Sequence, residues 1–196
     1  NKLITNFNIE LEKYQDLKSK NKAYNKYKFP EDTMKFSWSR ELKKRFERGR
    51  KIKFSEQNLV TALYRPFTKT NLYFSRDLNE IVSQQYKIFP RKNAQNKLIV
   101  ISGVGTRAGF SCLMTDCIPC LDMLEKGNSF PLLNYLDESG EDKQDIFDQS
   151  SIFGKEINLS QNNINQEYLK KVREKFGLNE IDEEVIFNYV YEILHS

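Results

Sequence analysis

The chain has 196 residues, of which 39% are hydrophobic and 30% are charged. This composition excludes a disordered chain, and the length is sufficient for one domain with a buried core. The longest apolar runs, such as residues 98–101, are far shorter than the ~20 residues that a membrane-spanning helix needs. The first residues also lack the apolar stretch of a signal peptide, and three cysteines cannot form a closed disulfide framework. We therefore expect a cytoplasmic protein without a membrane partner.

Charge is distributed unevenly along the chain, although the net charge is only +4. Residues 1–107 contain 24 Lys and Arg against 10 Asp and Glu, whereas residues 108–196 contain 7 against 17. A basic surface concentrates polyanions and an acidic surface repels them. The asymmetry favours nucleic acid as the partner of the first half and a scaffold or protein-facing role for the second. Charge runs that are only solvated surface remain the alternative.

The first part of the chain predicts two helices separated by a short strand. A loosely periodic apolar pattern predicts a helix over residues 8–28, and alternation predicts a strand over residues 34–38. Ser39 is a typical N-cap for a helix that continues to about Arg48, and Gly49 is a typical stop.

The middle of the chain predicts short strands with two helices among them. A buried strand is clearest over residues 97–102, and a glycine-rich turn at residues 103–109 follows it. Proline cannot continue a helix, so Pro66 lies beyond the helix that Ser55 and Glu56 begin. The full set comprises strands at 51–54, 71–74, 97–102, 110–114 and 118–121 and helices at 55–63 and 77–85.

Two amphipathic helices close the chain after an acidic stretch, residues 137–150, that we interpret as a mobile loop. Gly177 lies past the end of the first helix, and Asp182 caps the second. The predicted apolar stripe of the first helix is Tyr168, Leu169, Val172 and Phe176, and the predicted inner face of the second is Val185, Ile186, Tyr189, Val190 and Ile193. The whole pattern predicts an α+β fold, with a small mixed sheet flanked by helices.

The sequence offers little support for a catalytic or metal site. The only histidine, His195, is next to the last residue, which disfavours a Ser-His-Asp or Cys-His arrangement. Cys112, Cys117 and Cys120 lack the fourth ligand that structural zinc needs, and we expect them to act as small hydrophobic residues. The turn at residues 103–109 lacks the Gly-Lys-Ser/Thr of a phosphate-binding loop and leads into a strand. We therefore expect no catalytic residue, cofactor or metal in this chain.

A basic stretch over residues 40–53 is the strongest functional signal, with eight cationic side chains against two carboxylates. Cations on a helix and the adjoining turn are suited to phosphate contacts, which supply most of the sequence-independent affinity for nucleic acid. The residues that we predict to contact the DNA backbone are Arg40, Lys43, Lys44, Arg48, Arg50 and Lys51.

Further cations and one hydroxyl group lie at predicted turns and at the ends of elements. A guanidinium in such a position can reach a base edge in the major groove, most often that of guanine. The residues that we predict to contact bases are Arg107, Thr106, Arg65, Arg76 and Arg91. Aromatic side chains between Tyr64 and Phe89 could stack on single-stranded bases, but we assign most of them to the core.

Several segments, in order, resemble the C-terminal specificity region of type ISP single-polypeptide restriction–modification enzymes and related adenine-specific DNA methyltransferases. The resemblance rests on KFSWSRELK, LYRPF, NLYF, the segment ending in LMTDCIP, FPL and IFNYVYEILHS, at residues 35–43, 63–67, 71–74, 110–119, 130–132 and 186–196. It implies that residues 31–196 form a target recognition domain, preceded by an N-terminal helical linker over residues 1–30. The family continues beyond the last segment and has FPLY where this chain has FPLL. We therefore expect a C-terminally truncated domain, a fragment of a larger multidomain enzyme.

In that family the region reads an asymmetric DNA site and helps present the adenine to an upstream N6-adenine methyltransferase domain. The resemblance thus implies double-stranded DNA and that upstream domain as partners, with S-adenosylmethionine bound in the upstream domain. It also implies a possible nuclease and ATP-driven motor elsewhere in the parent chain. Because this chain contains none of their catalytic motifs, the resemblance implies no enzymatic activity for it alone. The alternative is a protein-interaction module that docks neighbouring domains without reading bases.

Overall fold

The computed structural model describes residues 2–20, 27–30, 37–80, 82–135 and 160–196. The helices in these ranges are α1 (Lys2–Ser19), α2 (Arg40–Glu47), the 3₁₀-helix η2 (Glu56–Asn58), α3 (Gln85–Ile88), α4 (Gln166–Phe176) and α5 (Glu183–His195). The strands are β1 (Leu59–Leu63), β2 (Lys69–Tyr73), β3 (Leu98–Ile101), β4 (Cys112–Thr115), β5 (Ile118–Pro119), β6 (Asn128–Pro131), β7 (Leu133–Tyr135) and β8 (Ser160–Asn162).

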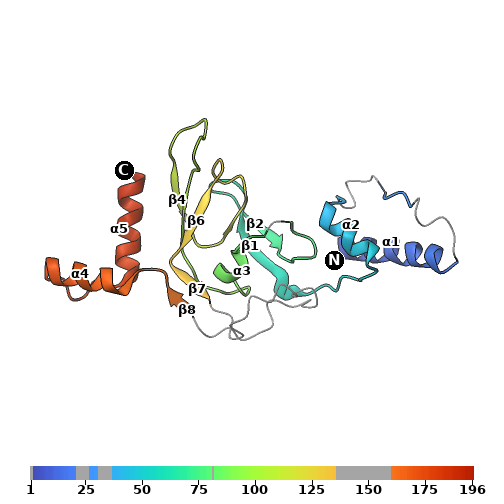
Figure 1. Cartoon of the computed structure of the whole chain (residues 1–196), viewed down its shortest axis with the longest axis horizontal. Helices are drawn as coiled ribbons and strands as arrows, with labels where there is room; N and C mark the ends of the chain where they lie inside the picture. Colours follow the sequence, from blue (N-terminus) through green and yellow to red (C-terminus); the bar gives the residue numbers. More distant parts are fainter. Residues whose placement is uncertain (1, 21–26, 31–36, 81, 136–159) are drawn as a thin grey trace.

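Small sheets occupy the middle of the molecule, with α1 and α2 at one end and α4 and α5 at the other (Figure 1). One sheet has the order β2-β1-β5, antiparallel between β1 and β2 and parallel between β1 and β5. The second has the order β4-β3-β6 and is antiparallel throughout, and β7 pairs with β8. The predicted α+β class with flanking helices is confirmed, although the described residues form separate small sheets, of which only β2-β1-β5 is mixed, in place of a single mixed sheet.

The central core lies between these sheets and the short helix α3. Its buried members include Leu98 and Val100 of β3, Ile118 of β5 and Phe74, which follows β2. Three consecutive residues of β3 are buried, which indicates that both faces of this strand are covered. Burial of apolar surface stabilises the fold by about 25 cal/mol per Å².

A second core joins α1 to α2. Phe7 and Leu11 of α1 are buried against Phe46 of α2 and Ile52. The described part of residues 1–30 is thus folded against residues that follow it, and the division of the chain at residue 30 stays a prediction.

The helix boundaries that rest on capping residues are confirmed. The Oγ of Ser39 accepts a hydrogen bond from the Leu42 N–H at 3.3 Å, and Gly49 has a φ of +72°, a conformation that favours glycine. Asp182 caps α5 by accepting from the Val185 N–H at 2.8 Å. Gly177 ends α4 in the left-handed conformation.

Three elements predicted between residues 51 and 85 are wrong, two of them because distant residues decide the local conformation. Residues 59–63 form β1 instead of a helix, since β1 pairs with β2 and with β5, which is more than 50 residues away. Residues 51–54 form no regular strand, because the backbone of Ile52 bonds to the Asn8 side chain of α1 in both directions, at 2.8 and 3.0 Å. In place of the helix predicted at 77–85, the described residues 77–80 and 82–84 form turns and irregular backbone, and the Ser75 N–H donates to Oδ1 of Asn79 at 2.7 Å.

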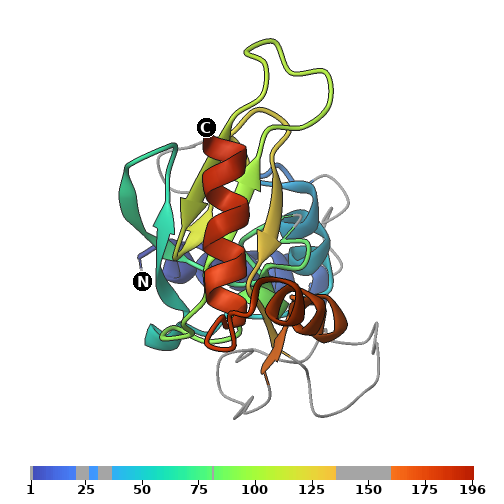
Figure 2. The same ribbon diagram turned by 90° about the vertical axis from the view of Figure 1, so that its left-hand side faces the viewer.

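The predicted inner face of α5 is correct only at Ile186, which is buried together with Phe187. The other four predicted residues, Val185, Tyr189, Val190 and Ile193, are exposed. Figure 2 shows α5 lying along the sheet of β3, β4 and β6, and Phe187 packs there on residues of β3 and β4. The sheet therefore covers a face of α5 that is rotated from the one that the periodicity favours.

Most of the strand predicted at 34–38 and all of the loop predicted at 137–150 lie outside the described residues. Within the described ranges, no helix is long and apolar enough to cross a membrane.

Candidate nucleic-acid interface

Helix α2 is fixed to the turn that follows β2 by a largely buried ion pair. The guanidinium of Arg45 contacts the carboxylate of Asp77, and the two side chains are only 14% and 17% exposed. Burial lowers the pKa of Arg45 and raises the pKa of Asp77, and each shift is opposed by the charge of the other group. Arg45 therefore anchors the helix and does not face solvent with the other cations.

A second contact joins the same two elements. The Glu41 N–H, in the first turn of α2, donates to Oε1 of Glu80 at 3.0 Å, and this hydrogen bond lowers the pKa of Glu80. Arg76 belongs to this turn, and its guanidinium lies 4.7 Å from the centre of the Tyr86 ring. The structure thus brings Arg76 into the neighbourhood of α2.

The six residues predicted to contact the DNA backbone are all exposed, on α2 and in the segment that follows it. Lys44 pairs with Glu41 at 2.9 Å and Lys51 pairs with Glu12 of α1 at 2.6 Å. Lys43 lies 5.3 Å from the centre of the Phe29 ring. An exposed ion pair stabilises a protein by only about 0–1 kcal/mol, so a phosphate can replace the carboxylate. Backbone contact by this set stays a prediction.

The glycine-rich turn between β3 and β4 projects beyond the sheets, at the top of Figures 1 and 2. Arg107, in this turn, has a side chain that is 92% exposed. Its backbone N–H and its Nε both donate to Glu125, at 3.0 and 3.3 Å. The hydroxyl of Thr106 donates to the Gly109 carbonyl at 3.0 Å and so serves the turn itself. The position of Arg107 therefore suits a base contact better than that of Thr106.

Residues that precede β6 contact the β3–β4 turn. The Nζ of Lys126 donates to the Gly105 carbonyl at 2.9 Å. A Cβ at Gly103 would lie 2.3 Å from the Lys126 carbonyl oxygen, so only glycine fits there. These contacts hold the projecting turn in one place relative to the sheet.

Arg65 and Arg91 lie on two other turns. Arg65 follows β1, with its guanidinium 5.3 Å from the centre of the Tyr64 ring, and Arg91 is exposed after α3. The predicted base-contacting residues are thus spread over several turns. The structure groups Arg76 with α2 but places Arg107 on a separate element, so their shared role also stays a prediction.

The β1–β2 turn, residues 64–68, contains an exposed aromatic side chain. Phe67, one of the aromatic residues that could stack on bases by sequence, is 88% exposed and does not belong to the core to which most of that set is assigned. The signal that could have found it is its position after Pro66, in a turn between two short strands, where side chains are often exposed.

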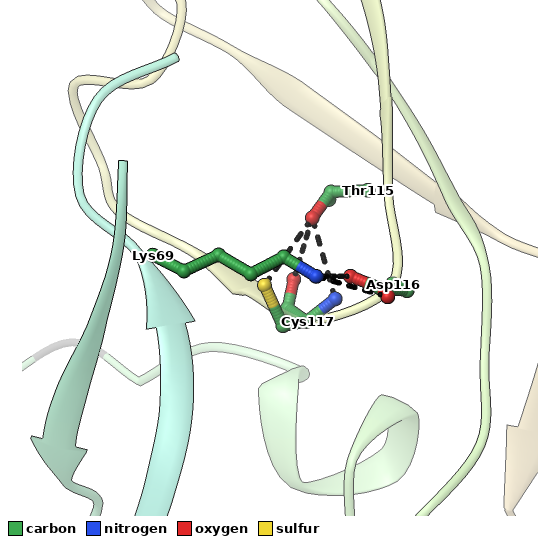
Figure 3. A network of polar contacts seen from close by, with 4 residues as sticks. All are labelled: Lys69, Thr115, Asp116 and Cys117. Carbon is green, nitrogen blue, oxygen red and sulfur yellow. Dashed lines mark hydrogen bonds and ion pairs between the residues drawn. The ribbon is translucent and has the colours of Figure 1, made fainter. Parts of the chain in front are cut away.

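Lys69 fixes the end of this turn to the segment after β4. Its Nζ donates to both carboxylate oxygens of Asp116, at 2.8 and 3.1 Å (Figure 3). The ammonium lowers the pKa of Asp116, and the carboxylate raises the pKa of Lys69. Next to this pair, the hydroxyl of Thr115 bonds to Cys117 (Figure 3).

Two hollows flank the sheets. One, of about 390 Å³, lies between the β1–β2 turn and β4 and is lined by Phe67, Leu113 and Met114, with Lys69 and Asp116 among its polar residues. The other, of about 310 Å³, lies between β3, β6 and α5 and is almost entirely apolar.

Cys112 and Cys117 are buried, and Cys120 is partly buried. Burial raises the pKa of Cys112 and of Cys117, which disfavours the thiolate that a metal or a nucleophilic reaction needs. The Sγ of Cys120 accepts from the Arg65 N–H at 3.2 Å. In the described part of the chain, no three His, Cys, Asp or Glu residues are grouped as metal ligands.

Comparison with solved structures finds proteins of similar fold, including the following three. A nuclease-deletion mutant of the Type ISP restriction–modification enzyme LlaGI, in complex with a DNA substrate mimic, is 35% identical over 68% of this chain, with a TM-score of 0.61. The DrdV–DNA complex, solved by cryo-electron microscopy, is 30% identical over 98% of this chain, with a TM-score of 0.70. The ATP-dependent Type ISP restriction–modification enzyme LlaBIII, bound to DNA, is 25% identical over 99% of this chain, with a TM-score of 0.67.

This chain covers only 11%, 16% and 11% of those three proteins, respectively. No curated protein matches the sequence. The model of the Type ISP C-terminal specificity domain matches residues 1–196, the whole chain. The resemblance that the sequence indicated is thereby confirmed, and the chain belongs to the family of Type ISP C-terminal specificity domains.

Proposed function

We propose that this chain recognises a specific sequence of double-stranded DNA, as the specificity domain of a restriction–modification enzyme. The observation that carries the proposal is the match of the entire chain to the specificity-domain family, together with structural neighbours that were solved with DNA. The exposed cations of α2 and the projecting β3–β4 turn support it, because they offer a phosphate-binding surface and a protruding guanidinium.

The recognition mechanism divides between two kinds of contact. Cations such as Lys43, Arg48 and Lys51 hold phosphates and set the position of the domain on the duplex. Arg107 reaches from the β3–β4 turn to a base edge, where a bidentate contact to guanine discriminates by about 1–3 kcal/mol. Arg76, next to α2, and Arg65 and Arg91 on their own turns are the further candidates for base contacts.

The parent enzyme supplies the chemistry. We propose an N6-adenine methyltransferase domain outside this chain, which binds S-adenosylmethionine, with a nuclease and an ATP-driven motor in the same polypeptide. LlaBIII is described as ATP-dependent and LlaGI as carrying a nuclease that was deleted, which supports this arrangement. The specificity domain would then select the site on which those domains act.

Selection from a random pool of duplexes tests the proposed function. The 196-residue chain should enrich one short sequence, and each single base-pair change in that sequence should weaken binding by about 1–3 kcal/mol. A pool that converges on no sequence would contradict the proposal.

Arg107→Ala should lower discrimination at one base-pair position of the enriched sequence by about 1–3 kcal/mol. The matched control is Lys170→Ala on α4, an exposed cation that should leave every position unchanged. The measurement is a set of dissociation constants for all single-substitution duplexes. An Arg107 variant that discriminates as well as the unmodified chain would remove Arg107 from the base-contacting set.

A protein-interaction module is the second candidate, and exposed apolar side chains on the C-terminal helices favour it. Phe176 of α4 and Tyr189, Val190 and Ile193 of α5 are exposed, which is unusual for four large apolar residues on adjacent helices. If these helices dock another domain while the rest reads DNA, both activities coexist. If the chain binds no duplex at low salt, docking alone remains.

A further inference from the structure

The β1–β2 turn carries a feature that the proposed function does not use. Phe67 presents almost its whole ring to solvent, and Tyr64 at the start of the turn is also exposed. The ring borders the hollow lined by Leu113 and Met114 but stays largely exposed there, so it is available for contact with another molecule.

The backbone of this turn is strained. Arg65 has a φ of +60° and Phe67 has a φ of +69°, in the left-handed region that residues other than glycine seldom adopt. Such conformations persist only where the surrounding structure enforces them, and they cluster at functional sites. Two residues with positive φ, Arg65 and Phe67, lie within one five-residue turn, and Phe67 carries the exposed ring.

Contacts at both ends of the turn enforce this conformation. The Tyr64 N–H donates to the Thr68 carbonyl at 2.7 Å and closes the turn. The Arg65 N–H donates to Cys120, and Lys69 pairs with Asp116. These contacts fix the conformation of the turn that carries the ring.

The charge beside the ring favours DNA over a protein surface as its partner. Arg65 lies two residues before Phe67 and is exposed, with its guanidinium 5.3 Å from the centre of the Tyr64 ring. A cation flanking a protruding apolar ring matches the side chains that enter DNA, where the ring separates bases and the cation meets the phosphate.

We propose that Phe67 is a wedge that inserts between two stacked base pairs of the bound duplex. The inference rests on the proposed function, since it requires that the chain binds double-stranded DNA. An apolar ring makes no base-specific hydrogen bond, so the wedge contributes affinity without choosing the sequence. The ring unstacks one base step, and the duplex kinks more easily at that step.

The test uses the 196-residue chain and the duplex that it enriches from a random pool. Each adenine in turn is replaced by 2-aminopurine, whose fluorescence rises when its base is unstacked. Binding of the unmodified chain should raise the emission at one step, and Phe67→Ala should remove that rise. The same variant should weaken binding about tenfold for the enriched duplex and for a scrambled duplex alike. Phe67→Trp should retain both properties.

Two further variants keep the result interpretable. Phe176→Ala removes an exposed ring from α4, far from the turn, and should change neither emission nor affinity. Phe67→Gly relieves the positive φ, so it should raise the melting temperature by about 2–4 °C while it loses the same DNA affinity as Phe67→Ala. A gain in stability with a loss of binding distinguishes a functional ring from a structural one.

The possible failures are distinguishable. If the unmodified chain enriches a duplex but Phe67→Ala binds it with unchanged affinity and unchanged 2-aminopurine emission, the wedge is wrong and the proposed function stands. Phe67 would then face another protein domain. If the unmodified chain binds no duplex at low salt, the proposed function fails and the wedge fails with it.

Discussion

The two helical ends of the molecule have similar sequence patterns and opposite surroundings. At the N-terminal end, the rings of Phe7, Tyr14 and Trp38 lie 5.0–6.0 Å from Phe46 or from one another, and Phe46 is completely buried. At the C-terminal end, α5 buries Ile186 and Phe187 but leaves the apolar side chains of its other faces exposed.

This difference teaches that periodicity identifies residues on one helix face but not what covers that face. Helix α2 meets α1 and an aromatic cluster, so its apolar face completes a core. Helix α5 meets a single sheet, which covers only one side of a helix whose apolar residues extend around more than half of it. The N-terminal end therefore encloses a core, whereas the C-terminal end leaves apolar side chains exposed.

The largest expected effect is that of Phe46→Ala. Removal of a fully buried ring leaves a cavity and should lower the free energy of unfolding by about 3–5 kcal/mol. Ile193→Ala on α5 is the matched change and should cost less than about 0.5 kcal/mol, because that side chain is exposed. Urea unfolding of the two variants measures both values. Equal losses would show that the two ends are not different in packing.

Asp77→Asn should have the next largest effect and should lower the free energy of unfolding by about 3 kcal/mol. The substitution leaves the Arg45 charge largely buried without its partner, which is costly even where the pair itself adds little stability. Glu41→Gln, which removes the exposed partner of Lys44, serves as the control and should change stability by less than about 0.5 kcal/mol. Chemical denaturation measures both, and a small effect of Asp77→Asn would mean that α2 is not anchored through Arg45.

Loss of a helix cap should have the same moderate effect at both ends. Ser39→Ala and Asp182→Ala each leave a first-turn N–H without its acceptor, so each should cost about 1 kcal/mol. Thermal unfolding measures the pair. Capping is a local interaction, so the loss of stability should not depend on how deeply each helix is buried. A much smaller loss of stability for Asp182→Ala would indicate that α5 is only loosely attached.

The smallest expected effect concerns the Lys69–Asp116 pair, which belongs to neither end. The ammonium lowers the pKa of Asp116 in the folded state. The stability that this adds is present above the ordinary carboxyl pKa and is lost as the pH falls through the lowered value. Asp116→Asn should therefore reduce stability slightly at pH 7 and leave it unchanged at the acidic limit, as measured by unfolding at several pH values.

The elements that the sequence predicts correctly depend on signals within a few residues. Ser39 and Gly49 bracket α2, and Asp182 begins α5, because caps act on the adjacent turn. The apolar run of β3 is long enough to identify a buried strand without knowledge of its neighbours.

The elements that the sequence misses depend on residues far away in the chain. The segment that became β1 starts with helix-like signals, but its partner strand β5 comes more than 50 residues later. The rotated face of α5 follows from the position of the β3–β4 sheet and not from the helix itself.

In the candidate site, too, some features are predictable from the sequence and others arise only from folding. The sequence identifies the exposed cations of α2 and of the β3–β4 turn, since charged side chains on turns and amphipathic helices are almost always solvated. It does not reveal that Lys51 meets Glu12 or that Arg107 meets Glu125, because both contacts are made by folding. Nor does it reveal that Phe67 is exposed, which depends on the strained conformation of its turn.

The salt dependence of duplex binding tests the central claim most directly. If the six predicted backbone residues each neutralise one phosphate, the logarithm of the association constant should fall against the logarithm of salt concentration with a slope of about −5. Reversal of Lys43 and Lys44 to Glu should make that slope shallower by about two while sequence preference is kept. An affinity for duplex DNA that is absent at low salt, or that does not change with salt, would contradict the account.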